Sequence, residues 1–309
     1  MTRSHVSFAG LWSMAIDVPY SYLLRDGDLA WTCGQLALDS EANAIHNGDL
    51  AAQSSVVCDH VDAILERAGL SRHGVQRLYL YHANSPDDAI AAMLDVITDR
   101  LGSSVDLVPL AVPHFYYDGV VLEVDVFWGG PAAELRWVHG PGGRSRLSEH
   151  IVSPSDSLTD HVEALDPGAV IDGGPHLTET RWIGVDVADG VVRSDVGITD
   201  SVSVVSRRSE PFLWLQGRST DEGKSLVAQT EALMRRLAEV LATHGYEFTD
   251  VVKSTTHYIG GNTAEELHDN MSVRNAYYRS PGPASTGVPV HGFADPRSKI
   301  VVDLTLIRR

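Results

Sequence analysis

The stretch AAQSSVVCDHVDAILERAGLSRHGVQRLYLY, residues 51–81, indicates the fold because a similar stretch occurs later in the same chain. Residues 227–257, VAQTEALMRRLAEVLATHGYEFTDVVKSTTH, align with it without a gap at a constant offset of 176. In both stretches apolar residues recur at helical spacing, a glycine (Gly69 or Gly245) follows the last turn, and a strand-like run comes next. This self-similarity predicts an internal repeat of one helix-and-strand unit.

The flanking segments repeat as well. Upstream of each helix, a glycine (Gly34 or Gly217) lies just past an aromatic-rich strand, LAWTCGQL or FLWLQGRS. Downstream come a second helix with an acidic or Thr263-capped start, and a β-branched closing strand, VVLEVDVFW or KIVVDLTLI. The order β-β-α-β-α-β, found twice, predicts an α+β protein of two tandem domains, residues 1–150 and 151–309, each a mixed sheet backed by two helices.

The segment between the repeats, residues 129–168, is rich in Gly, Pro, Ser and Asp, which is typical of a connector. One extra strand is expected around residues 135–138. Two alternating runs in residues 181–198 meet at Asp189-Gly190, a strong hairpin signal, so we expect a hairpin that extends the second sheet.

Composition limits the partners. A formal net charge of −17 argues against nucleic acid, which is bound mainly through Lys and Arg. No apolar run approaches the roughly 20 residues that span a bilayer, and the two cysteines, Cys33 and Cys58, look like isolated core thiols of a cytoplasmic protein. Neither metal-ligand spacing nor a phosphate-binding glycine motif is present, so we expect a small-molecule substrate and no metal or cofactor.

Residues 19–70, PYSYLLRDGDLAWTCGQLALDSEANAIHNGDLAAQSSVVCDHVDAILERAGL, resemble the opening of the reactive intermediate deaminase family, the RidA or YjgF-like proteins. The resemblance implies a chorismate-mutase-like fold, assembly as a homotrimer, and pockets between neighbouring sheets. It also implies cofactor-free hydrolysis of imines and enamines. In that chemistry an arginine holds the substrate carboxylate and a glutamate on the last strand orients water.

Transferred residue by residue, the resemblance places Tyr20, Cys33, Gly34 and Glu123 in the pocket of the first copy. The family arginine is missing from both copies, and Val301 replaces the glutamate in the second copy. The expected substitutes for the missing arginine flank the second aromatic-rich strand, because Arg presents a planar fork to carboxylates. They are Arg207, Arg208 and Arg218, and Gly217 of the same strand is a further candidate for substrate binding.

The second copy also resembles chorismatases, two-domain proteins that cleave the enolpyruvyl ether of chorismate with an acid on the last strand. The resemblance rests on Arg274-Asn275-Ala276-Tyr277-Tyr278 followed by Pro-Ala-Ser-Thr-Gly, which contains Ser285 and Thr286. In this alternative Asp303 is the acid, while Arg274, Tyr277, Ser285 and Thr286 bind substrate.

Glu123 and Asp125 alternate with Leu122 and Val124, so both carboxylates are expected on one face of a strand, where they could divide acid and base roles. The alternative is an exposed face that the two acids merely solubilise.

His257 and Tyr258 end another strand and are candidate hydrogen-bond donors, although a structural role is commoner for a single histidine. Three functions stay open: a hydrolase of imine-like carboxylates, a chorismatase-like enzyme, and a metabolite-binding protein without catalysis.

Overall fold

The computed structural model describes residues 3–129, 136–138, 150–152, 158–159, 186–187, 194–195, 201–209, 212–260, 263–290, 292–293 and 296–308. The description excludes the side chains of residues 136–195, 205 and 207–209. The first half, up to residue 129, contains β1 (Arg3–Ser7), β2 (Ser21–Asp26), β3 (Leu29–Thr32), β4 (Gln35–Leu36), α1 (Leu50–Arg67), the 3-10 turn η1 (Arg72–Gly74), β5 (Val75–Ala83), α2 (Asp87–Leu101), β6 (Asp106–Val112) and β7 (Leu122–Gly129).

The second half, from residue 202, contains β13 (Val202–Ser209), β14 (Phe212–Ser219), α3 (Leu226–Thr243), η2 (Phe248–Asp250), β15 (Val251–Tyr258), α4 (Ala264–Asn275), β16 (Ala284–Pro289) and β17 (Ile300–Ile307). Short strands lie between the halves: β8 (Arg136–Val138), β9 (His150–Val152), β10 (Leu158–Thr159), β11 (Asp186–Val187) and β12 (Ser194–Asp195). The predicted mixture of helices and strands is therefore present, with both repeated stretches forming a helix followed by a strand.

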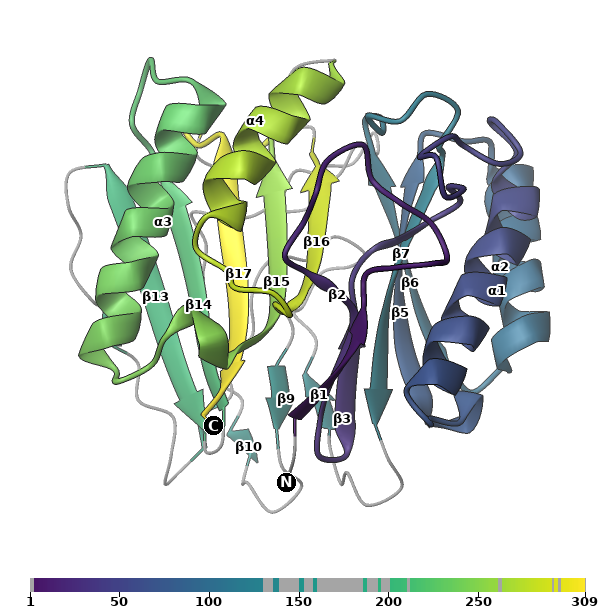
Figure 1. Ribbon diagram of the computed structural model, residues 1–309, viewed down its shortest axis with the longest axis horizontal. Helices are drawn as coiled ribbons and strands as arrows, with labels where there is room; N and C mark the ends of the chain where they lie inside the picture. Colours follow the sequence, from purple (N-terminus) through teal and green to yellow (C-terminus); the bar gives the residue numbers. More distant parts are fainter. Residues whose placement is uncertain are drawn as a thin grey trace.

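One large sheet runs through both halves. Its path is β12-β13-β14-β17-β15-β16-β2-β3-β7-β5-β6, so the order β2-β3-β7-β5-β6 of the first half has the same pattern as β13-β14-β17-β15-β16 of the second. In each half the last two strands of that order are parallel. Figure 1 shows α3 and α4 covering one half of the sheet and α1 and α2 the other. The division into two domains stays a prediction, since the halves share this sheet.

The helix ends follow the signals in the sequence. Asp49, Ser225 and Thr263 cap the starts of α1, α3 and α4, each with a side-chain oxygen that accepts a backbone N–H of the first turn. Gly69 and Gly245 have φ values of 65° and 71°, the left-handed conformation that a C′ glycine supplies after α1 and α3. In the second copy, the helix that Thr263 caps was expected to span residues 263–279, and α4 ends earlier, at Asn275.

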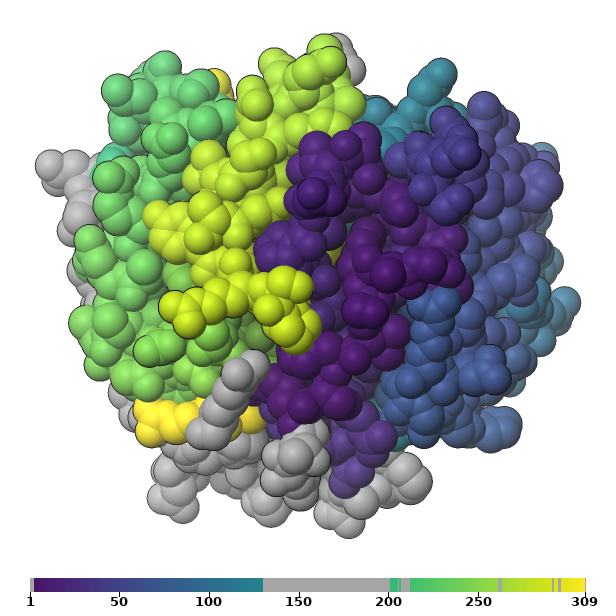
Figure 2. Space-filling model, viewed as in Figure 1, coloured from purple at the N-terminus to yellow at the C-terminus, as the bar shows by residue number. Residues whose placement is uncertain are grey.

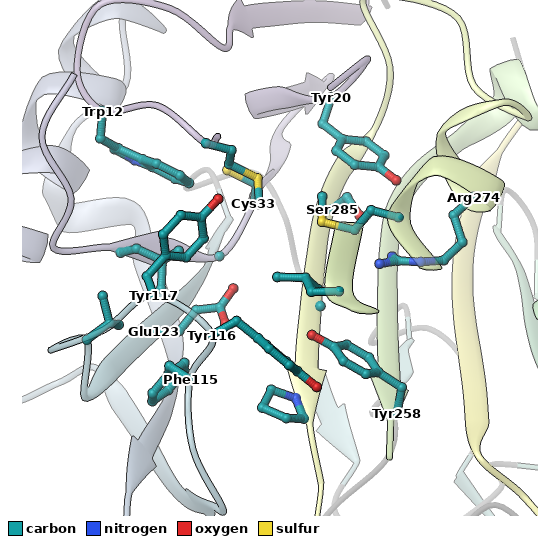
Figure 3. A pocket seen from close by; sticks show the side chains of 18 of the residues that line it. Trp12, Tyr20, Cys33, Phe115, Tyr116, Tyr117, Glu123, Tyr258, Arg274 and Ser285 are labelled. Carbon is teal, nitrogen blue, oxygen red and sulfur yellow. The ribbon is translucent and has the colours of Figure 1, made fainter. Parts of the chain in front are cut away.

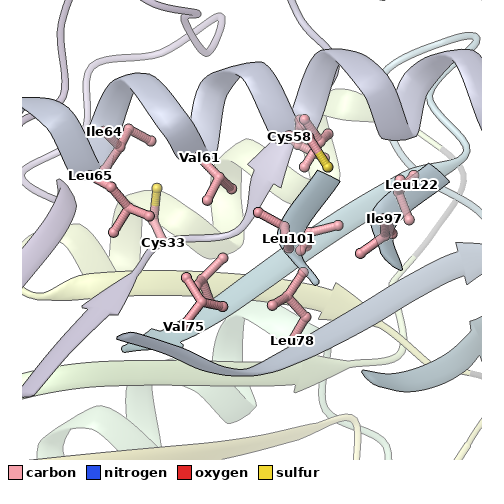
Figure 4. Close-up of a cluster of buried hydrophobic side chains, with 14 of the residues drawn as sticks. Cys33, Cys58, Val61, Ile64, Leu65, Val75, Leu78, Ile97, Leu101 and Leu122 are labelled. Atoms are coloured by element: carbon pink, nitrogen blue, oxygen red, sulfur yellow. The ribbon is translucent and has the colours of Figure 1, made fainter. Parts of the chain in front are cut away.

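The core of the first half lies between α1, α2 and the sheet. Figure 4 shows Cys58, Val61 and Ile64 of α1 packed over strand residues such as Leu78, with Cys33 beside them. The second half has its own cluster, in which Leu233 and Leu237 of α3 pack on the sheet. The helices were predicted from apolar residues at helical spacing. These residues form one apolar face of each helix, and its burial against the sheet drives the packing.

The strands between the two halves agree in part with the strands that the sequence predicted there. β8 pairs with β9, which places a strand where residues 135–138 suggested one. β12 extends the large sheet beside β13, but β11 pairs with β10, so the described pieces of the expected hairpin pair with other strands and not with each other. The turn Asp189-Gly190 lies outside the described residues. No helix in the described ranges is long and apolar enough to cross a membrane.

The two halves meet where β16 lies beside β2 through the pair Ala284 and Ser21. The backbone N–H of Gly282 donates to the carbonyl of Pro19 at 2.7 Å, and the N–H of Ser21 donates to the carbonyl of Pro283 at 3.1 Å. A Cβ at position 282 would lie 2.7 Å from that Pro19 oxygen, so this approach requires glycine. Figure 2 shows the N-terminal segment, in purple, directly against the yellow-green segment of the second half.

Candidate functional site

A cavity lies at the junction of the two halves, a kind of place where small-molecule sites often form. The first half supplies its lining from the segment between β1 and β2, from the β3–β4 connection, from the loop before β7 and from β7 itself. The second half supplies side chains of β15, α4 and β16. Figure 3 shows these two groups of side chains facing each other across the cavity.

Glu123 of β7 is the one acid among the described residues that line the cavity. It and Asp125 share a face of the strand, while Leu122, Val124 and Val126 point into the core as predicted. Both acids are buried, with 6% and 3% of their surface exposed, so this face is not merely a solvated one. Burial, reinforced by the nearby Asp125 charge and opposed by Lys253, raises the pKa of Glu123 well above its usual value.

Gly34 makes room for that carboxyl group. It lies in the break between β3 and β4, where a Cβ would overlap the Oε1, Cδ and Cγ atoms of Glu123. The predicted role of Gly34 in the pocket therefore has a steric basis: the glycine allows the glutamate to reach the cavity. It also joins the halves, because its N–H donates to the carbonyl of Ser285 at 3.4 Å.

Arg274 of α4 is the one cation among the described residues that line the cavity. It is only 2% exposed, and its Nε donates to Oδ1 of Asn270 at 2.9 Å while Nη1 donates to Oγ1 of Thr256 at 3.0 Å. These two bonds fix the guanidinium plane, and Nη2 makes no hydrogen bond to any described residue. Figure 3 shows the guanidinium directed into the cavity. Fixed in this way, it presents a donor suited to a ligand carboxylate.

Three phenol groups line the same part of the cavity. The Oη atoms of Tyr116 and Tyr258 are buried without a hydrogen-bond partner among the described residues, whereas the hydroxyl group of Tyr20 interacts with Ser285. Burial raises the pKa of each, to about 12 for Tyr116. Buried hydroxyl groups are normally hydrogen-bonded, so donors left over in a cavity point to a ligand or ordered water. Ser285 of β16 adds another hydroxyl to the lining.

A charged network lies next to the cavity. Nζ of Lys253 donates to Oδ1 of Asp125 at 2.8 Å, to Oγ1 of Thr286 at 2.6 Å, and to the carbonyl of Thr32 at 2.8 Å. Thr286 also donates to Asp125. Thr286 thus links the two halves, and it is absent from the cavity lining.

Cys33 lines the cavity and also belongs to the core of the first half. Its Sγ accepts from Nε2 of Gln35 at 3.1 Å, and burial raises the pKa of its thiol. A high thiol pKa leaves little thiolate to act as a nucleophile, which suits the core role.

Asp303 lies outside this cavity lining, on β17. Its Oδ1 accepts from Nε2 of Gln216 at 3.0 Å, and Oδ2 is 3.7 Å from Nδ1 of His257. The buried His257 thus lies near Asp303, whereas its neighbour Tyr258 lines the cavity.

The other residues proposed from the second copy lie elsewhere. Nε of Arg218 donates to Oγ of Ser203 at 2.8 Å. Gly217 faces α3, where a Cβ would lie 2.7 Å from Leu233 Cδ1, and the ring of Tyr277 packs 5.2 Å from that of Phe248. Arg207 and Arg208 occupy β13, but their side chains are outside the described part of the chain.

Sequence reasoning overlooked several lining residues. Trp12 lies before β2, and Phe115 and Tyr116 belong to the aromatic run PHFYY of residues 113–117. That run between two strands was a usable signal, because aromatic clusters in loops often mark binding surfaces. Among the described residues, no three His, Cys, Asp or Glu side chains gather closely enough to hold a metal ion.

The sequence of this chain is similar to those of known proteins. The family model described as Endoribonuclease L-PSP matches residues 13–106. A RutC family protein of Pyrococcus abyssi is 33% identical over 86 residues, which are 28% of this chain and 66% of that protein. A RutC family protein of Pyrococcus horikoshii is 31% identical over 86 residues, 28% of this chain and 67% of that protein. The chain thus spans about two thirds of the length of these relatives.

Solved structures give similar matches. A member of the YjgF/YER057c/UK114 family from Mycobacterium tuberculosis is 19% identical, with a TM-score of 0.34 over 41% of this chain and 99% of that one. RidA from an Antarctic Psychrobacter species is 21% identical, with a TM-score of 0.34 over 39% of this chain and 96% of that one.

Proposed function

The chain belongs to the superfamily of RutC, YjgF and RidA proteins, and from that membership we propose that it hydrolyses the C=N bond of a small 2-imino carboxylate or its enamine tautomer. Rid proteins are imine deaminases. The products would be a 2-keto acid and ammonia, formed without a cofactor. The activity and its substrate are proposals for this chain.

The observation that carries the proposal is the meeting of Glu123 and Arg274 in one cavity. The glutamate comes from β7 of the first half and the arginine from α4 of the second. A cation held by two hydrogen bonds suits a substrate carboxylate, and a carboxyl group with a raised pKa suits proton transfer near neutral pH. The chain therefore compensates for the missing family arginine with a residue from a different element.

The reaction follows from these positions. Arg274 binds the substrate carboxylate, with Ser285 and Tyr20 beside it. Glu123, starting as the neutral acid, gives its proton to the imine nitrogen, and its carboxylate then accepts a proton from a water molecule whose oxygen bonds to the imine carbon. In the resulting carbinolamine the hydroxyl group gives up its proton to the nitrogen, the C–N bond breaks, ammonia leaves, and the hydroxyl oxygen becomes the keto oxygen. Across the two steps one water is consumed and Glu123 regains its proton.

Two variants test the assignment against freshly generated 2-imino acids, with keto acid and ammonia followed by NMR. Glu123→Gln should lower kcat by about 10²–10⁴-fold, because the amide cannot exchange a proton in this way. Arg274→Met should lower kcat/KM by about 10–100-fold, corresponding to the loss of one charge-assisted hydrogen bond.

Asp303→Asn serves as the matched control, since this carboxylate lies outside the cavity lining. It should leave the rate within about twofold of the native rate, as removing a group that does not contact the substrate leaves transition-state binding unchanged. A folded Glu123→Gln protein at full rate would refute the role of Glu123. Pyruvate released from chorismate by the native protein, but not by Asp303→Asn, would favour the chorismatase-like alternative.

A further inference from the structure

We infer that the substrate of this site is a monocarboxylate with an aromatic or similarly bulky apolar side chain, such as the 2-imino acid derived from phenylalanine. The inference rests on the proposed function, since it specifies the substrate of the same reaction. It comes from the division of the cavity into a polar end and an aromatic end.

The aromatic end belongs to the first half. It is lined by Phe8, Trp12, Met14, Leu36, Phe115 and Val120. In Figure 3 Trp12, Tyr117 and Phe115 lie on one side of the cavity, Arg274 and Ser285 lie on the other, and Glu123 lies between the two sides. A substrate whose carboxylate contacts Arg274 and whose imine carbon lies at Glu123 would therefore extend its side chain towards the aromatic rings.

The polar atoms of Trp12 and Tyr117, at the aromatic end, already have hydrogen-bond partners in the protein. Nε1 of Trp12 donates to Oε1 of Gln35 at 3.0 Å, and Oη of Tyr117 accepts the backbone N–H of Ala15 at 3.0 Å. At the other end, the hydroxyl group of Tyr258 has no such partner among the described residues, and neither has Nη2 of Arg274. One end thus offers ring surfaces, and the other offers unused hydrogen-bond donors.

The aromatic wall is also preformed. The ring of Phe8 packs against those of Trp12 and Tyr22 at centroid distances of 4.7 and 4.4 Å, and the N–H of Trp12 donates to Oη of Tyr22 at 3.1 Å. Trp12 is only 2% exposed. A wall fixed before binding loses little conformational entropy when a ring packs on it, and this favours bulky apolar side chains over a methyl group.

Charge limits the substrate to one carboxylate. Arg274 is the single cation among the described lining residues, and Glu123 is the single acid. The neighbouring Lys253 already binds Asp125 and Thr286. A second carboxylate, as in the imine of glutamate or in chorismate, would have to enter the aromatic end without a partner, which is costly.

The test compares kcat/KM for the imino acids formed from phenylalanine, alanine and glutamate by an amino acid oxidase. We expect the phenylalanine imine to be preferred over the other two by about tenfold or more, the range that apolar pockets achieve. Equal or higher kcat/KM for the alanine or glutamate imine would overturn the inference while leaving the proposed hydrolysis intact.

Binding provides a readout that does not depend on catalysis. Calorimetric titration of the native protein should show 3-phenylpropanoate binding about tenfold or more tightly than propanoate or glutarate. If this preference holds but no imine is hydrolysed, the proposed function fails and the specificity of the site stands. If 3-phenylpropanoate binds no better than propanoate, the inference fails.

Phe115→Ala tests the aromatic end directly, and Phe248→Ala is its matched control. Both phenylalanines are partly buried, but only Phe115 lines the cavity. Phe115→Ala should reduce the preference for 3-phenylpropanoate over propanoate by about fivefold or more, the scale of a truncated apolar contact. Phe248→Ala should leave that ratio unchanged. An equal effect of both variants would show that Phe115 acts through general stability, which would overturn its assignment to the substrate side chain.

Discussion

Nζ of Lys253 lies 2.8 Å from Oδ1 of Asp125, although the two residues are 128 positions apart and belong to different halves of the chain. Asp125 is two residues from Glu123 on the same face of β7, and its charge contributes to the raised pKa of that acid, whereas Lys253 opposes the rise. One ion pair therefore ties the halves together and adjusts the acid in the cavity between them.

Removing the lysine should destabilise the protein strongly. Lys253→Met leaves the Asp125 carboxylate, 4% exposed, without its cation, and breaking a buried pair in this way costs about 3–5 kcal/mol. Urea denaturation measures the loss. Glu239→Gln, which breaks the more exposed Arg236–Glu239 pair on α3, should cost about 0–1 kcal/mol. Similar losses for the two variants would show that the Lys253–Asp125 pair does not stabilise the junction.

Gly34→Ala should disable the site. The new Cβ would occupy the space of the Glu123 carboxyl group, and a displacement of about 1 Å at a catalytic group can cost about 10²-fold in rate. Gly217→Ala, at the matching position of the second half, would press on Leu233 and Leu237 of α3. It should lower the melting temperature while leaving the rate of the folded protein unchanged. Loss of rate in both variants would argue against the specific relationship between Gly34 and Glu123.

The stability difference between the native protein and Glu123→Gln should depend on pH. Glu123 has an ordinary pKa of 4.5 when unfolded and a higher one when buried. A raised folded pKa gives stability that is present below the unfolded pKa and is lost as pH rises through the folded pKa. The glutamine variant has no such titration, so it should gain stability relative to the native protein as the pH rises from about 4.5 towards the raised pKa of the buried Glu123. Urea denaturation over this range measures the trend, and a constant difference would contradict the raised pKa.

Neither cysteine should react readily in the folded protein. Burial raises the pKa of the thiol of Cys58 to about 11 and also raises that of Cys33, so almost no thiolate is available near neutral pH. Titration with a chromogenic disulfide reagent should detect the thiols slowly in the native protein and rapidly in denaturant. Cys33→Ser should retain hydrolysis within about tenfold, and a larger loss would indicate a chemical role for the sulfur.

Local sequence was enough to predict the helices and strands of the two repeated stretches. The α1 and α3 stretches, with their capping residues and the glycines Gly69 and Gly245, carry signals that act within a few residues of the chain. The alternation around Glu123 likewise predicted which side chains of β7 face the core. Family resemblance added Tyr20, Gly34 and Glu123, all of which line the cavity.

Which of the other candidates share a site follows from the tertiary structure. Arg274 and Glu123 are far apart in sequence, and they meet because β16 lies beside β2, a pairing of two strands that no local pattern specifies. The same packing leaves Asp303, Arg218 and Gly217 outside the cavity lining, since each is on a strand farther from the junction. Periodicity shows which face of a strand or helix is buried, whereas long-range strand pairing determines what that face meets.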